Sequence, residues 1–165
     1  GLDPFHDELL QVSIIDEEGN VLFDSYFKPI RHTDWWEAES VNGISPEMVA
    51  DAPYINEKAA ELYAILSQAH WIIGYNVDFD LRFLMGSDII TDEEYNAFRT
   101  EDVMIQFAEI YGEYSVYHED YKWQKLTTAA AYYDYEWNVK GIEAHNSLAD
   151  CFATLFVYHK ILSGE

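Results

Sequence analysis

The amino-acid sequence predicts an α/β domain in which helices pack on the faces of a mixed β-sheet. Three observations support this fold class: a hairpin pattern near the start, a short buried strand in the middle, and a long apolar helix at the end. The 165 residues fit a single domain, residues 1–165, that would bury roughly two thirds of the surface of its unfolded chain. Hydrophobic residues make up 49% of the chain, so a packed core is readily supplied.

The first predicted element is a β-hairpin. Apolar and polar residues alternate over residues 10–14, which is the period-two pattern of a half-buried strand. The Glu-Gly-Asn sequence at residues 18–20 predicts a turn, and residues 21–27 predict a return strand that ends before Pro29. The sheet is therefore expected to begin with an antiparallel pair.

The middle of the chain predicts two helices and then a buried strand. A short helix is expected after Ser45, which suits the N-cap position, with Pro46 in the first turn. Residues 54–69 carry apolar side chains at helical spacing and predict an amphipathic helix. The apolar run at residues 70–76 predicts a buried strand, and the chain is expected to turn helical directly after it.

Three more helices are predicted, over residues 102–111, 126–133 and 145–162. In the last one, apolar side chains at helical spacing predict the main core stripe: Leu148, Cys151, Phe152, Leu155 and Leu162. Asp150 lies about 200° around the helix from Leu148, on a face of small residues. A carboxylate on such a face leaves room for a bound group.

The charge of the chain limits its partners. Nine Lys and Arg residues stand against 31 Asp and Glu residues, which gives a formal net charge of −22. A chain this acidic repels a phosphate backbone at long range, which argues against a general DNA-coating protein. It leaves open an enzyme that holds a strand end through bound cations, because metal ions invert the local electrostatics.

Cysteine usage and hydropathy indicate the compartment. The single Cys151 excludes an internal disulfide framework and fits a reducing cytoplasm, which is the expected location. No apolar run approaches the roughly 18 residues that span a bilayer, so no membrane partner is expected.

Two acidic residues follow the predicted strand end at Asn76. The carboxyl end of a strand in an open α/β sheet is where ligands bind. Asp78 is well placed as a helix N-cap, whereas Asp80 is the better candidate for a ligand-binding carboxylate because Phe79 and Leu81 flank it with apolar surface. The alternative is structural: Asp78 only caps the helix, and Asp80 is only a first-turn acid that complements the positive end of the helix.

His145 and Asp150 flank the start of the last predicted helix. Their five-residue separation is not a helical repeat, so His145 must lie in the loop before the helix if both side chains meet at one site. A histidine in that position is suited to proton transfer. The alternative is structural, because Ser147 and Asp150 have the spacing of a capping box.

Together these motifs resemble those of the DEDDh 3′–5′ exonucleases, the family of the proofreading epsilon subunit of bacterial DNA polymerase III. Asn76, Phe79 and Asp80 match the family motif Asn-x-x-Phe-Asp, and His145 and Asp150 match His-x-x-x-x-Asp. The resemblance runs over nearly the whole chain in the family's order. It implies a ribonuclease H-like mixed β-sheet flanked by helices.

The resemblance also implies a reaction. The family hydrolyses the 3′-terminal phosphodiester of DNA or RNA with two divalent cations, Mg²⁺ or Mn²⁺, and releases nucleoside 5′-monophosphates. By this resemblance, Asp80 and Asp150 would bind metal, and His145 would take the proton from the attacking water. Asn76 and Phe79 would position the terminal nucleotide of a single-stranded or frayed 3′ end. A DNA polymerase or a replication or repair assembly would be a candidate partner.

The family's first motif marks the main departure. It reads Asp-x-Glu-Thr-(Thr/Gly)-Gly-Leu, and only Gly1 and Leu2 match its tail. We expect the first, central strand with its two carboxylates to be missing from these residues, and the native protein to continue upstream through it. The alternative is a catalytically disabled family member, or an acidic binding module that mimics nucleic acid. Asp3, Asp7 and Glu8 lie beyond the motif and are expected in a solvated loop.

Overall fold

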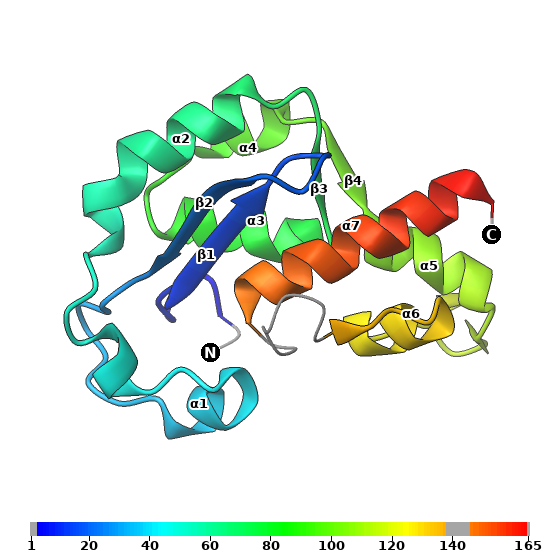
Figure 1. Ribbon diagram of the computed structural model, residues 1–165, viewed down its shortest axis with the longest axis horizontal. Coiled ribbons are helices and arrows are strands. Elements are labelled where there is room, and N and C mark those ends of the chain that lie inside the picture. Colours follow the sequence, from blue (N-terminus) through cyan, green and yellow to red (C-terminus); the bar gives the residue numbers. More distant parts are fainter. Residues whose placement is uncertain (1–2, 138–145, 165) are drawn as a thin grey trace.

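The computed structural model describes residues 3–137 and 146–164 and has the predicted mixed α/β character (Figure 1). The strands are β1 (Gln11–Ile15), β2 (Val21–Tyr26), β3 (Ile72–Gly74), β4 (Thr100–Asp102), β5 (Tyr114–Ser115) and β6 (Asp120–Tyr121). The α-helices are α1 (Trp36–Asn42), α2 (Ala59–Gln68), α3 (Val77–Gly86), α4 (Asp92–Ala97), α5 (Val103–Tyr111), α6 (Leu126–Tyr132) and α7 (Ser147–Ser163). Two 3-10 helices, η1 (Pro46–Val49) and η2 (Ile55–Lys58), lie between α1 and α2.

The predicted hairpin is confirmed. β1 and β2 pair antiparallel, with a register shift between Ile14 and Ile15. The connecting turn contains Gly19, whose φ of 82° lies in the left-handed region that glycine adopts at no steric cost. Val12 and Ile14 pack against the core on one face of the hairpin, and α7 contacts β1 as well. The hairpin therefore links the core to the last helix.

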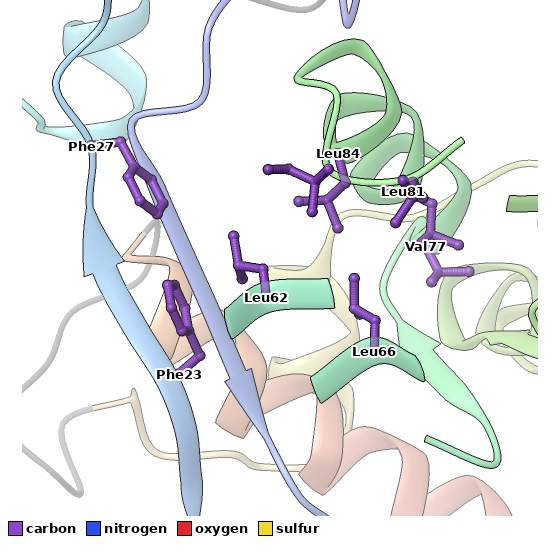
Figure 2. Close-up of a cluster of buried hydrophobic side chains, with 9 residues drawn as sticks. Phe23, Phe27, Leu62, Leu66, Val77, Leu81 and Leu84 are labelled. Carbon is purple, nitrogen blue, oxygen red and sulfur yellow. The ribbon is translucent and has the colours of Figure 1, made fainter. Parts of the chain in front are cut away.

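The larger core lies between the hairpin, α2 and α3 (Figure 2). Its buried members are Phe23, Phe27, Leu62, Leu66, Val77, Leu81, Leu84, Ile89 and Ile90. The predicted amphipathic helix is confirmed as α2, although Ala69 lies beyond its end and is exposed. Burial of Val77, Leu81 and Leu84 fixes α3 against the core, because each large apolar side chain removed from water contributes about 1.5–3 kcal/mol.

A second core cluster packs α5, α6 and α7 together, and consists of Val103, Phe107, Ala129, Tyr133 and Val157. The core stripe predicted for α7 is wrong. Its buried residues are Ala149, Ala153, Thr154 and Val157, whereas Leu162 is 64% exposed. The physical reason is that α7 contacts β1 as well as α5 and α6, and close approach on two sides favours small side chains.

The remaining strands form small, separate sheets. β3 pairs parallel with β4, which the sequence did not predict because the residues of β4, Thr-Glu-Asp, carry no apolar pattern. The β1–β2 and β3–β4 pairs lie in different sheets, and within residues 3–137 and 146–164 no strand joins them. Within the described residues the strands thus form three separate pairs, two antiparallel (β1–β2 and β5–β6) and one parallel (β3–β4), and no central strand joins β1–β2 to β3–β4.

Two short helices and the β5–β6 hairpin were also missed. In the described structure neither α1 nor α4 buries a residue, so neither has an apolar stripe that periodicity could reveal. α4 does begin with a capping box between Thr91 and Glu94, a signal that was present in the sequence.

The expected short helix after Ser45 is confirmed as η1, with Pro46 as its first residue. None of the helices in the described ranges is both long and apolar enough to cross a membrane.

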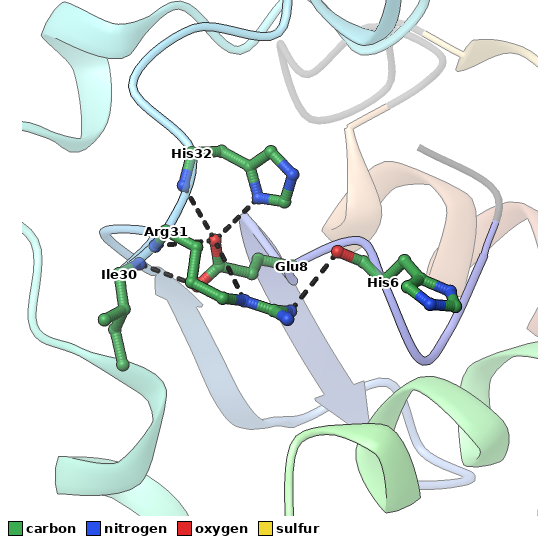
Figure 3. A network of polar contacts seen from close by, with 5 residues as sticks. All are labelled: His6, Glu8, Ile30, Arg31 and His32. Carbon is green, nitrogen blue, oxygen red and sulfur yellow. Dashed lines mark hydrogen bonds and ion pairs between the residues drawn. The ribbon is translucent and has the colours of Figure 1, made fainter.

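Glu8 is not the solvated side chain that the sequence predicted. Its carboxylate accepts hydrogen bonds from the backbone N–H groups of Ile30 (2.7 Å), Arg31 (2.9 Å) and His32 (3.0 Å), and the His32 Nδ1 atom lies 2.7 Å away (Figure 3). The Glu8 side chain is only 15% exposed. Burial raises its pKa, but the hydrogen bonds from Ile30, His32 and Arg31 outweigh burial and hold the pKa below the usual value. Glu8 thus fixes the segment before β1 to the loop after β2.

Replacing Glu8 with glutamine is expected to lower the free energy of unfolding by about 1–3 kcal/mol, because a neutral amide satisfies these donors less well. A carboxylate whose folded pKa is depressed stabilises the fold above its unfolded pKa, and this contribution is lost as the pH falls through the folded pKa. The difference in unfolding free energy between the wild type and the variant should therefore be largest near neutral pH and should decrease as the pH falls. Urea unfolding at several pH values measures it, with the exposed Glu17→Gln as control. A constant difference at all pH values would contradict this role.

Candidate functional site

Asp80 lies in the first turn of α3, which begins where β3 ends. The apolar residues Val77, Leu81 and Leu84 face the core, and Asp80 is exposed to solvent. Protein nevertheless surrounds its carboxyl group closely. Burial, then the negative charges of Asp102 and Asp150, raise the pKa of Asp80 to about 7. A positively charged ligand near Asp80 would offset the repulsion from Asp102 and Asp150.

Asp150 lies in the first turn of α7. The capping box considered from the sequence is wrong, because Asn146 and not Ser147 is the N-cap: its side-chain oxygen accepts from the N–H groups of Leu148 (3.1 Å) and Ala149 (3.5 Å). The helix start is tied to the hairpin, since the Ser147 N–H donates to Gln11 Oε1 at 3.1 Å. The carboxylate of Asp150 is therefore not needed to cap the helix.

The structure brings Asp80 and Asp150 close enough for their charges to interact. Both also act on Cys151, whose thiol pKa is raised to about 12 by burial and then by Asp80 and Asp150. Three side chains from α3 and α7 thus share one neighbourhood, although α3 and α7 are far apart in the sequence. His145, the predicted catalytic base, lies outside the described residues.

Asp102 is the residue of this site that the sequence did not single out. It ends β4 and caps α5, where its Oδ1 atom accepts the Met104 N–H at 2.9 Å. The same carboxylate accepts the N–H groups of Asn76 (3.0 Å) and Val77 (3.2 Å), at the start of α3. One side chain therefore holds the starts of two helices. The only signal in the sequence was its position as the first residue of the helix predicted over residues 102–111, which points to a role at the start of α5 but not to the bonds with α3.

An Asp102→Ala protein is expected to lose about 2–4 kcal/mol of unfolding free energy, because three backbone donors lose a charged acceptor. Relief of the repulsion between Asp102 and Asp80 offsets part of this loss. Chemical denaturation measures the change, with Asp92→Ala, an exposed acid in the first turn of α4, as the matched control. Equal stabilities for the two variants would show that Asp102 does not join α3 to α5.

The two residues predicted to contact substrate lie beside Asp80. Asn76 occupies the N-cap position of α3 in the left-handed conformation, with φ 68° and ψ 51°. Phe79 is half-buried, and its ring packs against Phe83 with centroids 4.9 Å apart. Asp78 is not the N-cap that the sequence predicted. It forms an ion pair with Arg82 at 2.8 Å and accepts a hydrogen bond from the Tyr95 hydroxyl.

The described residues do not by themselves provide a metal site. Among the residues that the structure describes, no group of three or more His, Cys, Asp or Glu side chains could hold a metal ion. A cavity of about 210 Å³ lies next to α3, but Asp78, Tyr95 and Asn96 are among its lining residues and Asp80 is not. The chemistry that the site can offer is that of two neighbouring carboxylates at helix starts.

The chain is similar to known exonucleases along nearly its whole length. The sequence profile of the family described as Exonuclease matches residues 1–158. The uncharacterized exonuclease CP81 of Escherichia phage 186 is 29% identical over 163 residues, which is 95% of this chain and 81% of the phage protein.

Two larger proteins match about half of the chain. The 3′-5′ exonuclease DinG of Staphylococcus epidermidis is 32% identical over 82 residues, 48% of this chain and 9% of DinG. A DNA polymerase III of the PolC type from Thermotoga maritima is 32% identical over 87 residues, 51% of this chain and 6% of the polymerase. The matched part is a small fraction of both relatives.

A solved structure has a similar fold. Exonuclease X in complex with 5′ overhanging duplex DNA matches with a TM-score of 0.58 at 17% identity, over 94% of this chain and 87% of that chain. This likeness confirms the predicted ribonuclease H-like fold. The family profile, which spans almost all residues, confirms the resemblance found in the sequence motifs. The chain belongs to the exonuclease family.

Proposed function

We propose that this protein is a metal-dependent 3′–5′ exonuclease that hydrolyses the 3′-terminal phosphodiester of DNA or RNA and releases nucleoside 5′-monophosphates. The observation that carries the proposal is the match of the Exonuclease family over residues 1–158, with Asp80 and Asp150 in the first turns of α3 and α7. Family membership supports a nuclease. The match of both sequence motifs supports the 3′–5′ direction.

We propose that Asp80 and Asp150 bind divalent cations, Mg²⁺ or Mn²⁺, two in the complete site. Carboxylate oxygens are the ligands that these hard cations prefer. The repulsion among Asp80, Asp102 and Asp150 also favours a cation, because bound positive charge would offset it. Bound divalent cations would polarise the phosphoryl group and lower the pKa of a bound water. Two side chains are only part of a ligand set for two metals.

The rest of the set is proposed to come from a strand between β1 and β3. In the family that Asn76, Phe79 and Asp80 resemble, the first motif supplies two metal-binding carboxylates from the central strand. The separation of the β1–β2 and β3–β4 pairs in the described chain fits this placement. A strand there would also pair backbone groups that are otherwise left at two sheet edges.

The remaining side chains have separate tasks in this proposal. His145 takes the proton from the attacking water, a role that suits an imidazole with a pKa near 6.5. Asn76 and Phe79, in the same segment as Asp80, position the terminal nucleotide. Single-stranded or frayed 3′ ends are the preferred substrates, because a net charge of −22 repels a long duplex. A DNA polymerase or a replication or repair assembly is the proposed partner, given the PolC-type relative.

A catalytically disabled protein is the second candidate. It is favoured by the absence of any three-residue metal-ligand group from the described residues. Such a protein, at a net charge of −22, would act as an acidic binding module that mimics nucleic acid. The proximity of Asp80 and Asp150 favours the enzyme, because a mimic has no need for paired carboxylates at helix starts.

A strand-end assay tests the proposal. The full-length protein should shorten 5′-labelled single strands of DNA or RNA one nucleotide at a time from the 3′ end when Mg²⁺ or Mn²⁺ is present. EDTA should stop the reaction, and 3′-labelled strands should release only mononucleotides. Internal cleavage, or cleavage that persists in EDTA, would contradict the exonuclease. Intact strands in Mg²⁺ and in Mn²⁺ would favour the disabled protein.

A further inference from the structure

Acidic residues are unevenly distributed in this chain. All 31 Asp and Glu residues lie outside two segments, residues 121–133 and 151–164. The same two segments hold three of the nine basic residues, namely Lys122, Lys125 and Lys160. Because a phosphate backbone is repelled by carboxylates at close range, the exposed side chains of these segments are candidates for contact with nucleic acid.

The two acid-free segments meet in space. Residues 121–133 include α6 and residues 151–164 form most of α7, and α6 contacts α7 along the second core cluster (Figure 1). Asp150 lies in the first turn of α7, directly before the second segment. Carboxylates of other elements border both segments, since Glu113 pairs with Lys122 and Glu101 accepts a hydrogen bond from the Tyr158 hydroxyl. Residues 121–123 and 125 are exposed and provide a surface that a strand leaving the site can contact.

The residues before α6 add an exposed aromatic side chain to this surface. Trp123 is 64% exposed and lies between two lysines, Lys122 and Lys125, which are both exposed. The Lys122 Nζ atom is paired with Glu113 at 2.6 Å, which leaves Lys125 as the better contact for a phosphate. An exposed ring flanked by basic residues is the combination that binds unpaired bases by stacking and the backbone by charge.

This aromatic segment is tied to the candidate site. The Tyr75 hydroxyl donates a hydrogen bond to the backbone carbonyl of Gln124 at 2.9 Å. Tyr75 directly precedes Asn76, and its ring packs into the second core cluster. The position of Trp123 is thus fixed relative to the end of β3, from which α3 and Asp80 start.

We propose that residues 121–125 form a strand-binding segment for the single-stranded nucleic acid that leads away from the 3′ end in the site. Trp123 stacks on an unpaired base, and Lys125 contacts a phosphate. This inference rests on the proposed nuclease function. An acidic protein partner is the weaker match, because acidic side chains would use the lysines but offer no base for Trp123 to stack on.

The first test measures binding without hydrolysis. In EDTA, the full-length protein binds a fluorescent single strand of about 12 nucleotides, a length within the usual range for stacking proteins. Trp123→Ala is expected to raise Kd about 5- to 100-fold, and Trp123→Phe is expected to retain most of the wild-type affinity. Trp71→Ala is the matched control, since Trp71 is 50% exposed but precedes β3, at the opposite end of that strand from Tyr75. Unchanged affinity in Trp123→Ala, or an equal loss in Trp71→Ala, overturns the proposal.

The second test uses salt dependence to identify the phosphate contact. Lys125→Gln should reduce the slope of log Kd against log salt by about 0.7, the value for one phosphate contact on a single strand. Trp123→Ala should leave the slope unchanged, because stacking releases no counterions. A Lys125→Gln slope equal to that of the wild type contradicts the phosphate contact. Binding of polyglutamate, but not of the oligonucleotide, in a Trp123-dependent manner would assign the segment to an acidic protein and overturn the proposal.

A hydrolysis assay with a short and a long substrate then distinguishes failure of the strand-binding segment from failure of the proposed nuclease function. A dinucleotide has a single nucleotide upstream of the cleaved bond, so Trp123→Ala should change its cleavage in Mg²⁺ less than it raises KM for a long strand. If the wild type cleaves neither substrate, the proposed function fails, yet a Trp123-dependent Kd still supports the segment. If the wild type cleaves both and Trp123→Ala has unchanged KM for each, the segment fails alone.

Discussion

An Asp150→Asn protein should hydrolyse strand ends at least about 100-fold more slowly than the wild type and should bind Mg²⁺ or Mn²⁺ more weakly. The amide has nearly the same shape as the carboxylate but lacks the charge, so it is a poor ligand for a hard cation. Changes in residues that merely orient metal ligands already cost about 10–100-fold, and loss of a ligand should cost more. Titration of the rate with Mg²⁺ measures both effects.

The structure provides a matched pair of controls in α3. Asp80→Asn should behave like Asp150→Asn, since both carboxylates belong to the proposed metal site. Asp78→Asn should retain most of the activity, because Asp78 is in the same helical turn but pairs with Arg82 and Tyr95. Equal losses in Asp78→Asn and Asp80→Asn would show that the first turn of α3, rather than a metal-binding carboxylate, is responsible.

His145→Ala is expected to reduce the rate by about 10²–10⁴ while metal affinity stays at the wild-type level. A general base transfers a proton and does not bind the cation, so the kinetic loss should appear in kcat and not in the Mg²⁺ dependence. Calorimetric titration with Mn²⁺ checks the affinity. The control is His70→Ala, an exposed histidine that precedes β3, at the opposite end of that strand from the candidate site. A wild-type rate in His145→Ala would remove the base from this mechanism.

Strong local patterns predicted most of the secondary structure. The alternation in residues 10–14 and the turn at Gly19 predicted the hairpin, and helical spacing predicted α2. The apolar run ending at Asn76 predicted β3 and the start of α3. Elements that bury little apolar surface, such as α1 and α4, left no such pattern and were missed.

What the sequence could not supply were contacts between distant elements. The small buried face of α7 depends on packing against β1, α5 and α6 at once, which no single helix pattern reveals. The bonds from Asp102 to Asn76 and from Glu8 to Ile30 depend on a folded backbone that presents N–H groups in one place. The motifs did identify Asp80 and Asp150, because their residue types match a known constellation; their roles as metal ligands remain predictions.

The left-handed backbone conformation of Asn76 explains why an asparagine occurs at this position, whether or not its side chain contacts a nucleotide. Left-handed geometry costs most residues about 1–2 kcal/mol, whereas glycine and asparagine tolerate it. A relative that had lost hydrolysis altogether would thus still be expected to retain asparagine or glycine at this place. The asparagine therefore indicates backbone geometry, whereas Asp80, Asp150 and His145 are the residues that would distinguish an active nuclease from one that has lost hydrolysis.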